Sequence, residues 1–323
     1  DSLEPELGAA IDAAAQKVID GEYDDQFVVD IFQTGSGTST NMNTNEVISN
    51  VAISALGGEL GSRDPVHPND HVNKGQSSND VIPTAIHLAA AGAIKERLLP
   101  AMAELENALR AKSEEFWPII KTGRTHLQDA TPIRLGQEFS GYVGQLEYGQ
   151  QRAAKALAEL SVLAIGGTAV GTGIGMHPEF ADRMIVQLKE MTGLDLSETA
   201  NHFQSQSSLD AIVEASGSLK TIAVSLMKIA NDVRWLGSGP RAGIGEIELP
   251  EVQPGSSIMP GKVNPVIAES VTMVCAQVIG NDATIAIAGQ SGHFEINVMM
   301  PIAAYNLLQS IDLLAATCEN FSR

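Results

Sequence analysis

Apolar residues recur every three or four positions over long stretches of the chain, which is the period of an amphipathic α-helix. Between these stretches, glycine and proline predict irregular backbone over 57–79 and 164–178, and residues 25–32 are predicted as a short extended run. Pro100 predicts a kink or interruption in one long helix. The helices are predicted over residues 3–19, 40–56, 81–116, 133–163, 179–191, 207–236, 265–289 and 298–320. We therefore expect an all-α fold, a bundle of long helices.

Two of these predicted helices carry more apolar surface than one neighbour can cover. In the helix over 207–236, apolar and small residues follow alternating steps of three and four, a heptad seam. The seam consists of Leu209, Ile212, Ser216, Leu219, Ala223, Leu226, Ala230 and Val233. The helix over 265–289 is apolar on several faces, and such a helix is buried on more than one side. We therefore predict a bundle core that is shared between subunits.

The charge balance argues against some classes of partner. The chain has 323 residues, enough for one large domain or two smaller ones, and a net charge of −19. This acidity argues against binding to nucleic acid or to an anionic membrane surface. The average surface would also repel an anionic substrate. A site for such a substrate must therefore be locally positive.

Three further features bear on the compartment. Cys275 and Cys318 are the only cysteines, and both lie in apolar helical patterns, which predicts buried free thiols and a reducing compartment. Residues 161–178 lack charge, but their glycines and the pair His177-Pro178 argue against a membrane span. The chain opens without a signal peptide and does not begin with methionine. We expect a cytoplasmic location, with the mitochondrial matrix as the alternative in a eukaryote.

The segment Gly255–Pro265 is the strongest candidate for chemistry. Its sequence, Gly-Ser-Ser-Ile-Met-Pro-Gly-Lys-Val-Asn-Pro, places two hydroxyls, a lysine and a carboxamide on one loop. The glycines permit backbone angles that other residues avoid, and the prolines prevent a regular helix. Asn264 and Pro265 are predicted as the N-cap and first position of the following helix. The loop can therefore present Ser256, Ser257, Lys262 and several backbone N–H groups to a small anion.

Polar motifs also precede two other predicted helices. Gly35-Ser36-Gly37-Thr38 comes before the helix at residue 40, and Ser77-Ser78-Asn79-Asp80 comes before the helix at residue 81. Helix N-termini present unpaired N–H groups and the positive end of a dipole, each worth about 0.3–1 kcal/mol to a nearby anion. Any one of these motifs is also explained by capping alone. If the helix ends converge, they make the anion pocket that an acidic protein otherwise lacks.

Four segments together resemble, in the same order, the signature segments of the fumarase/aspartase superfamily, and the likeness covers nearly the whole chain. They are Gln33–Asn43, His67–Asn73 running into Gln76–Asp80, Thr122–Pro132 and Gly255–Pro265. The chain is most similar to the long, metal-free class II fumarases. Aspartases usually carry Thr where this chain has Ser78, and Gln where it has His126. The resemblance implies a homotetramer with a central bundle of five long helices per subunit.

The resemblance also implies how the chain divides into domains. Residues 1–77 are expected to be the remainder of the N-terminal domain, and residues 78–323 the central long-helix domain. The small C-terminal domain of the family is expected to be absent. The chain is therefore expected to be truncated at both ends relative to the family.

The reaction that the resemblance implies is the reversible hydration of fumarate to malate, with no metal or other cofactor. A proton leaves the carbon next to a carboxylate through an aci-carboxylate dianion, which needs a strong base and donors aimed at the growing charge. By resemblance, Ser256 is the base, provided that N–H groups of its own loop stabilise its alkoxide. His126 handles the water, and Glu269 pairs with His126 and fixes its tautomer. The implied substrate-binding residues are Ser36, Thr38, Ser77, Ser78, Asn79, Thr125, Lys262 and Asn264.

Some matches and alternatives are weaker. His67, Asn69 and Asp70 match a second dicarboxylate site of the family, although we interpret them first as an ordered polar loop. His67 and His71 have the spacing of a zinc helix, but Pro68 replaces the required glutamate. Two functional alternatives stay open. One is an ammonia lyase such as aspartase, or another lyase that releases fumarate. The other is a helical scaffold without turnover.

Overall fold

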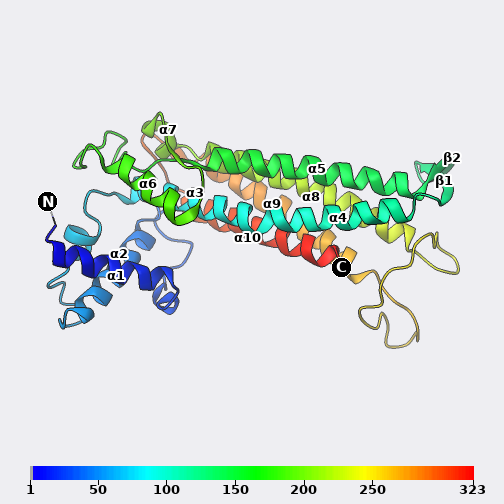
Figure 1. Ribbon diagram of the computed structural model, residues 1–323, viewed down its shortest axis with the longest axis horizontal. Helices are drawn as coiled ribbons and strands as arrows, with labels where there is room; N and C mark the ends of the chain where they lie inside the picture. Colours follow the sequence, from blue (N-terminus) through cyan, green and yellow to red (C-terminus); the bar gives the residue numbers. More distant parts are fainter. Residues whose placement is uncertain (1–2) are drawn as a thin grey trace. The chain divides into compact units, whose positions relative to one another are not determined.

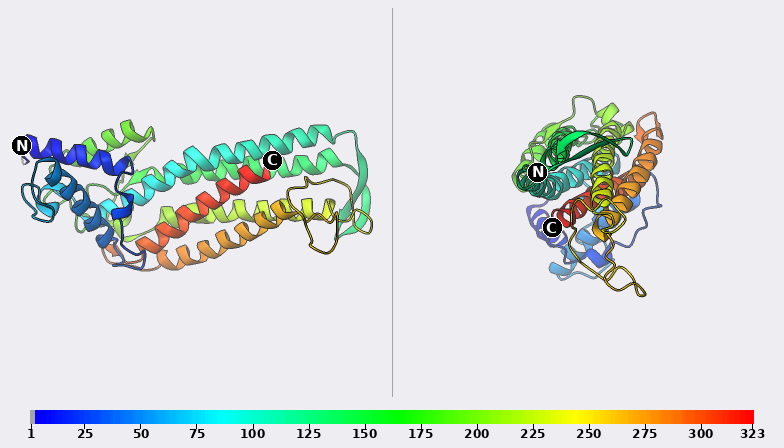
Figure 2. Two further views of the ribbon diagram at one scale, coloured as in Figure 1. Left: turned by 90° about the horizontal axis from the view of Figure 1, so that it is seen from below. Right: turned by 90° about the vertical axis from the view of Figure 1, so that its right-hand side faces the viewer.

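The computed structural model describes residues 3–323, and helices dominate it (Figures 1 and 2). The helices are α1 (Pro5–Ile19), α2 (Thr38–Ala55), α3 (Ser78–Ala93), α4 (Leu99–Glu115), α5 (Leu135–Leu160), α6 (Phe180–Thr192), α7 (His202–Ser207), α8 (Asp210–Leu236), α9 (Val266–Gly289) and α10 (Met300–Phe321). Short turns are the 3₁₀ turn η1 (Asp24–Gln26) and the π-helical turns η2 (Pro68–Val72) and η3 (Ile94–Leu98). The predicted helical class is confirmed.

The strands are short and form two-stranded pairs. The antiparallel pairs are β1 (Ile120–Thr125) with β2 (Gln128–Arg134) and β5 (Gly292–His293) with β6 (Ile296–Asn297), and the parallel pair is β3 (Val162–Leu163) with β4 (Ser197–Glu198). The β1–β2 hairpin was not predicted. It interrupts the helical period between α4 and α5 without an Asn-Gly or Asp-Gly turn to announce it.

The described residues fall into two compact units that interleave along the sequence. Unit 1 comprises the chain up to residue 88 together with 161–210 and 286–305, and unit 2 comprises 89–160, 211–285 and 306–323. In unit 1, α1 packs against α2. In unit 2, α4 packs along α5, and the ribbons of α8, α9 and the end of α10 run beside them (Figures 1 and 2). The predicted domain division after residue 77 stays a prediction.

Most predicted helices form within three residues of their expected bounds. The stretch 81–116 is interrupted as expected, because the turn η3 lies directly before Pro100, which has no N–H to continue the ladder. The prediction of an extended run over 25–32 is wrong at its start, where the 3₁₀ turn η1 forms. The run forms no strand, and Val28 and Phe32 are 81% and 79% exposed, with no neighbouring strand to cover them.

The two strongly apolar helices differ in how well one chain covers them. The heptad seam of α8 is buried at every predicted position, including Ser216. By contrast, α9 is buried along one face only, through residues such as Val271, Cys275 and Val278, while Met273 and Ile287 are 67% and 60% exposed. The multi-sided burial predicted for α9 is therefore not reached within a single chain. By length and composition α9 could also cross a membrane, a test that core helices of soluble proteins pass as well.

The two cysteines behave as predicted. Cys275 and Cys318 are buried and free. Burial raises the pKa of each thiol to about 12, so both stay protonated and unreactive at neutral pH.

Candidate functional site

The loop at 255–264 is closed by its own backbone. Gly255 N donates to Lys262 O at 2.9 Å, and Lys262 N donates to Met259 O at 3.2 Å. A Cβ atom on Gly255 would lie 2.3 Å from Lys262 O, so only glycine lets the two backbone segments approach this closely. The sequence therefore shapes a compact turn in which residues 256–261 are presented together.

Within this turn, the Ser256 hydroxyl is an acceptor of backbone hydrogen bonds. Ser256 Oγ accepts from Ile258 N at 3.3 Å and from Met259 N at 3.2 Å. Both donors belong to the loop itself, and they point at the atom that would carry negative charge in an alkoxide. Ser256 is partly buried, whereas Ser257 is exposed. Two N–H donors in this arrangement are of the kind that would stabilise a serine alkoxide.

Side-chain contacts join Lys262 to Asn264 and Asn264 to Gly255, the residue before Ser256. Lys262 Nζ donates to Asn264 Oδ1 at 2.9 Å, and Asn264 Nδ2 donates to Gly255 O at 3.1 Å. Asn264 therefore bridges the two ends of the loop and orients the ammonium group. Within residues 3–323, Lys262 forms no ion pair, so its charge is available to an anion.

The predicted capping role of Asn264 is wrong. Helix α9 begins at Val266, and its first intrahelical bond runs from Glu269 N to Pro265 O at 3.0 Å. The Asn264 side chain turns back to Gly255 and Lys262 instead of to the helix. The physical reason is competition: the loop carbonyl and the lysine offer the carboxamide two partners at once.

In unit 1, the N-termini of α2 and α3 converge. Ser36 Oγ lies 2.8 Å from Thr38 Oγ1, which lies 2.9 Å from Ser78 Oγ. These three hydroxyls are partly buried and form one connected group. The turn before α2 needs glycine, because a Cβ at Gly35 would lie 1.6 Å from Val298 O. Two helix ends and three hydroxyls make a locally positive, hydrogen-bonding surface in an acidic chain.

Ser77 and Asn79 complete this end of α3. The Ser77 side chain accepts from Asn79 N at 3.2 Å, so Ser77 acts as a helix cap, and its own O–H is left to donate. Asn79 Nδ2 donates to Ala169 O at 2.7 Å, which ties the helix end to the glycine-rich segment over 164–178. The structure therefore brings Ser36, Thr38, Ser77, Ser78 and Asn79 to one place.

Thr125 and His126 lie at the tip of the β1–β2 hairpin in unit 2. Thr125 pairs with Gln128, which leaves a two-residue turn of His126 and Leu127, each with φ of 57°. Two consecutive non-glycine residues in the left-handed region are strained, and such strain clusters at functional sites. Both Thr125 and His126 are exposed.

The contact expected between His126 and Glu269 stays a prediction. Within residues 3–323 of one chain, no hydrogen bond or ion pair joins the two side chains, and Glu269 is partly buried on the first turn of α9.

The residues of the second candidate site form one turn in unit 1. His67 Nδ1 accepts from Asn69 N and Asp70 N, both at 3.2 Å, and so caps η2. His71 Nδ1 accepts from His67 N at 2.9 Å. Because Nδ1 of His67 is an acceptor here, its 3.4 Å approach to Asp70 is not an ion pair. Capping accounts for the positions of all three residues.

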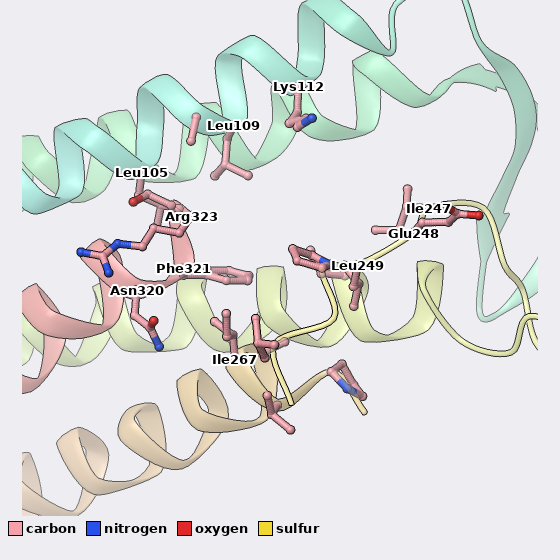
Figure 3. Close-up of a pocket in the computed structure, with 18 of the residues that line it drawn as sticks. Leu105, Leu109, Lys112, Ile247, Glu248, Leu249, Ile267, Asn320, Phe321 and Arg323 are labelled. Carbon is pink, nitrogen blue, oxygen red and sulfur yellow. The ribbon is translucent and has the colours of Figure 1, made fainter. Parts of the chain in front are cut away.

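A cavity in unit 2 has different chemistry from the loop at 255–264 (Figure 3). It has a volume of about 470 Å³ and is lined mainly by apolar side chains of α4, the start of α9, the end of α10 and the segment 247–252. Of the candidate site residues, only Asn264 lines it. We therefore do not assign the polar substrate to this cavity.

Comparisons with known proteins identify the family of the chain. A family model described as lyase matches residues 2–280. The mitochondrial fumarate hydratase of Schizosaccharomyces pombe is 58% identical over 99% of this chain and 62% of its own length. The class II fumarate hydratase of Neisseria meningitidis serogroup A is 56% identical over 99% of this chain and 69% of its own length. The chain belongs to the class II fumarase family.

A solved structure of this family has the same fold. The crystal structure of recombinant class II fumarase from Schistosoma mansoni superimposes with a TM-score of 0.97 at 42% identity, over 99% of this chain and 70% of that one. The present chain thus spans 62–69% of the length of the two curated fumarase relatives.

Asp80, which the sequence analysis placed in a helix-start motif without a role of its own, supports the N-terminal end of α3. Asp80 is fully buried, and its carboxylate accepts from Ser77 N at 3.1 Å and from Gly166 N and Thr168 N at 3.0 Å. It therefore locks the start of α3 to the glycine-rich segment that also holds Asn79. The spacing of Ser77 and Asp80, a capping-box pattern, was the signal that could have found it.

Proposed function

We propose that this chain carries the catalytic machinery for the reversible hydration of fumarate to L-malate. The observation that carries the proposal is the Ser256 hydroxyl, which accepts two backbone N–H bonds from its own loop. Three relatives that are 54–58% identical to this chain are named fumarate hydratases, which supports the same proposal. Because the chain spans only part of their length, activity is a proposal for the chain as it stands.

In the dehydration direction, the Ser256 alkoxide takes the proton from the methylene carbon of malate. The electron pair moves into the adjacent carboxylate and forms an aci-carboxylate dianion. Lys262 binds that carboxylate, and Asn264 keeps the ammonium group in place. The dianion then collapses to the double bond, and the hydroxyl leaves as water after receiving a proton. His126, with Glu269 as its partner, delivers that proton to the leaving hydroxyl through a bound water molecule.

The other groups bind and orient the substrate through hydrogen bonds. The connected hydroxyls of Ser36, Thr38 and Ser78, with Ser77 and Asn79, offer hydrogen bonds at two helix N-termini. Thr125 lies next to His126 on the hairpin tip. Such donors suit a carboxylate, since oxygen anions favour helix N-termini. We keep His67, Asn69 and Asp70 as a proposed second dicarboxylate site whose visible role is capping.

The substrate assignment has a direct test. Malate should produce the fumarate absorbance band, whereas aspartate should produce none, because Ser78 and His126 are the fumarase-like residues at the two positions that separate the family branches. Purified protein is assayed with each substrate, with and without ammonia. Loss of fumarate that depends on ammonia and outpaces hydration would reassign the chain to the ammonia lyases. Absence of both reactions would favour the scaffold.

We further propose that the chain assembles as a homotetramer with sites shared between subunits. The exposed apolar side chains of α9, including Met273 and Ile287, support this. Soluble proteins rarely leave a large apolar helix face exposed to water. Sedimentation at micromolar concentration should give a species of four chains. A stable, folded monomer would contradict the proposal.

The compartment is proposed on two grounds. The relatives include both mitochondrial enzymes and bacterial class II enzymes. The buried free thiols of Cys275 and Cys318 suit a reducing compartment. We therefore propose the cytoplasm, or the mitochondrial matrix if the source is eukaryotic.

A further inference from the structure

We propose that Glu246 is a positioning residue for the hairpin tip. Its carboxylate binds Lys121 and Arg124 of β1 and thereby fixes Thr125 and His126, which follow Arg124 directly. The inference rests on the proposed function, because the position of the tip matters to turnover only if His126 acts on the substrate.

The contacts form one partly buried charge network in unit 2. Glu246 Oε1 lies 2.8 Å from Arg124 Nη2, and Glu246 Oε2 lies 2.6 Å from Lys121 Nζ. Lys121 Nζ also lies 2.6 Å from Glu138 Oε2. The side chains of Lys121 and Glu246 are only 7% and 19% exposed. Two cations and two anions thus pair away from bulk water, where ion pairs hold their geometry better than on an open surface.

The two carboxylates stand on fixed elements. Glu246 N and Ile247 N both donate to Leu236 O, at 2.8 and 3.3 Å, so the segment of Glu246 is tied to the C-terminal end of α8. Glu138 lies in the first turn of α5. The cations, by contrast, lie on the hairpin. The network therefore fixes β1 of the hairpin relative to α5 and α8.

The hairpin has few other means of holding its tip. A lone two-stranded hairpin is at best marginally stable, and β2 is exposed over its first five residues. The pairing is irregular between Thr122 and Arg124, and the turn after Thr125 is strained. Arg134 donates to Trp117 O at 2.9 Å, but it pairs with Ile120 at the base of the hairpin. Among the side-chain ion pairs and hydrogen bonds of the hairpin within residues 3–323, the contact of Arg124 with Glu246 is nearest to the tip.

Glu246 is charged at neutral pH. Burial alone raises the pKa of this carboxyl, but the hydrogen bond from Arg124 and the ion pairs with Lys121 and Arg124 outweigh burial, and the net pKa lies below its usual value. A carboxyl with a lowered pKa contributes stability that is present above its unfolded value and is lost as pH falls through the folded value. The network is therefore intact throughout the neutral range.

The kinetic test uses Glu246→Gln, which keeps the shape and removes the charge. Because a shift of about 1 Å in a reacting group can cost about 10²-fold, we expect kcat to fall by up to that factor with a smaller change in KM. Glu246→Asp should recover part of the loss. The matched control is Glu214→Gln, which removes an exposed pair with Lys155 in the same unit and should leave kcat and KM as in the parent.

A second background separates positioning from general destabilisation. The variant His126→Gln already lacks the group that Glu246 would position. Adding Glu246→Gln to it should lower the residual rate by no more than about twofold, which is the usual deviation from additivity in such comparisons. If the full loss appears again in that background, Glu246 acts elsewhere and the proposal is overturned.

Amide hydrogen exchange of the full chain decides the matter without any turnover. Exchange over residues 122–128 should quicken in Glu246→Gln and stay unchanged in Glu214→Gln. Unchanged exchange in Glu246→Gln would overturn the proposal. A parent that does not hydrate fumarate would refute the proposed function alone, because the exchange result would still decide whether Glu246 holds the hairpin.

Discussion

Replacing Ser256 with alanine is expected to lower kcat by about 10²–10⁴, the range typical of a positioned acid or base. The substitution removes the proposed base and leaves Lys262 and Asn264 to hold the carboxylate. Fumarate should therefore still bind. The measurement is kcat and KM for malate dehydration, followed by fumarate absorbance, together with fumarate binding by calorimetry. The parent chain must first be shown to be active.

Two neighbouring variants make the Ser256 experiment specific. Ser257→Ala should change kcat much less, because Ser257 is exposed and its hydroxyl is not the acceptor of the loop N–H groups. Lys262→Ala should impair KM and kcat together, since a charge contact to a carboxylate acts in both ground and transition states. A dead Ser257→Ala beside a fully active Ser256→Ala would move the base by one residue. Full activity in both would place the base outside the loop.

The fold was largely predictable because its main signal is local. The helical period in stretches such as 207–236 is long, and α8 buries every position of its predicted seam. Pro100 predicted the interruption before α4, because proline has no N–H with which to continue the helical hydrogen bonds. Where a short segment depended on a distant partner, prediction failed. The run over 25–32 was predicted to be extended, but it begins with the 3₁₀ turn η1.

The candidate site was predictable as a set of residues but not as a geometry. Motif resemblance named Thr38 and Ser78, yet only the structure joins their hydroxyls, 40 positions apart. Asn264 was predicted to cap α9, whereas its side chain braces the loop, and its role in substrate binding stays a prediction. Asp80 and Glu246 were missed because their roles depend on partners far along the chain, Gly166 and Arg124.

The burial of α9 shows a second reason why a sequence-based prediction can differ from the structure of a single chain. Its composition predicted burial on several sides, and one chain supplies cover on only one. A sequence pattern records the environment in the complete assembly, whereas a single chain shows only its own packing. The exposed Met273 and Ile287 are therefore the positions at which a neighbouring copy would be expected.

The second large effect is expected from Gly255→Ala. The added methyl would lie 2.3 Å from Lys262 O and 2.9 Å from Asn264 N, closer than real Cβ contacts come. Both neighbours are backbone atoms of the same turn, so the turn must open. Opening breaks the bond from Gly255 N to Lys262 O and displaces Ser256 and the ammonium group together. Since a shift of about 1 Å can cost about 10²-fold, kcat/KM should fall by at least that factor.

The matched control for this loop is Gly261→Ala. Gly261 has φ of 77°, but nothing lies within 4 Å of an added Cβ, so alanine there meets backbone strain without a clash. That strain costs about 1–2 kcal/mol, part of which an exposed loop can relieve, and most activity should remain. Circular dichroism should show the parent's helical content in both variants, because the loop lies outside the helices. If Gly255→Ala keeps the parent's kcat/KM, the closed turn is not what positions Ser256, and its two N–H bonds cannot be the source of its basicity.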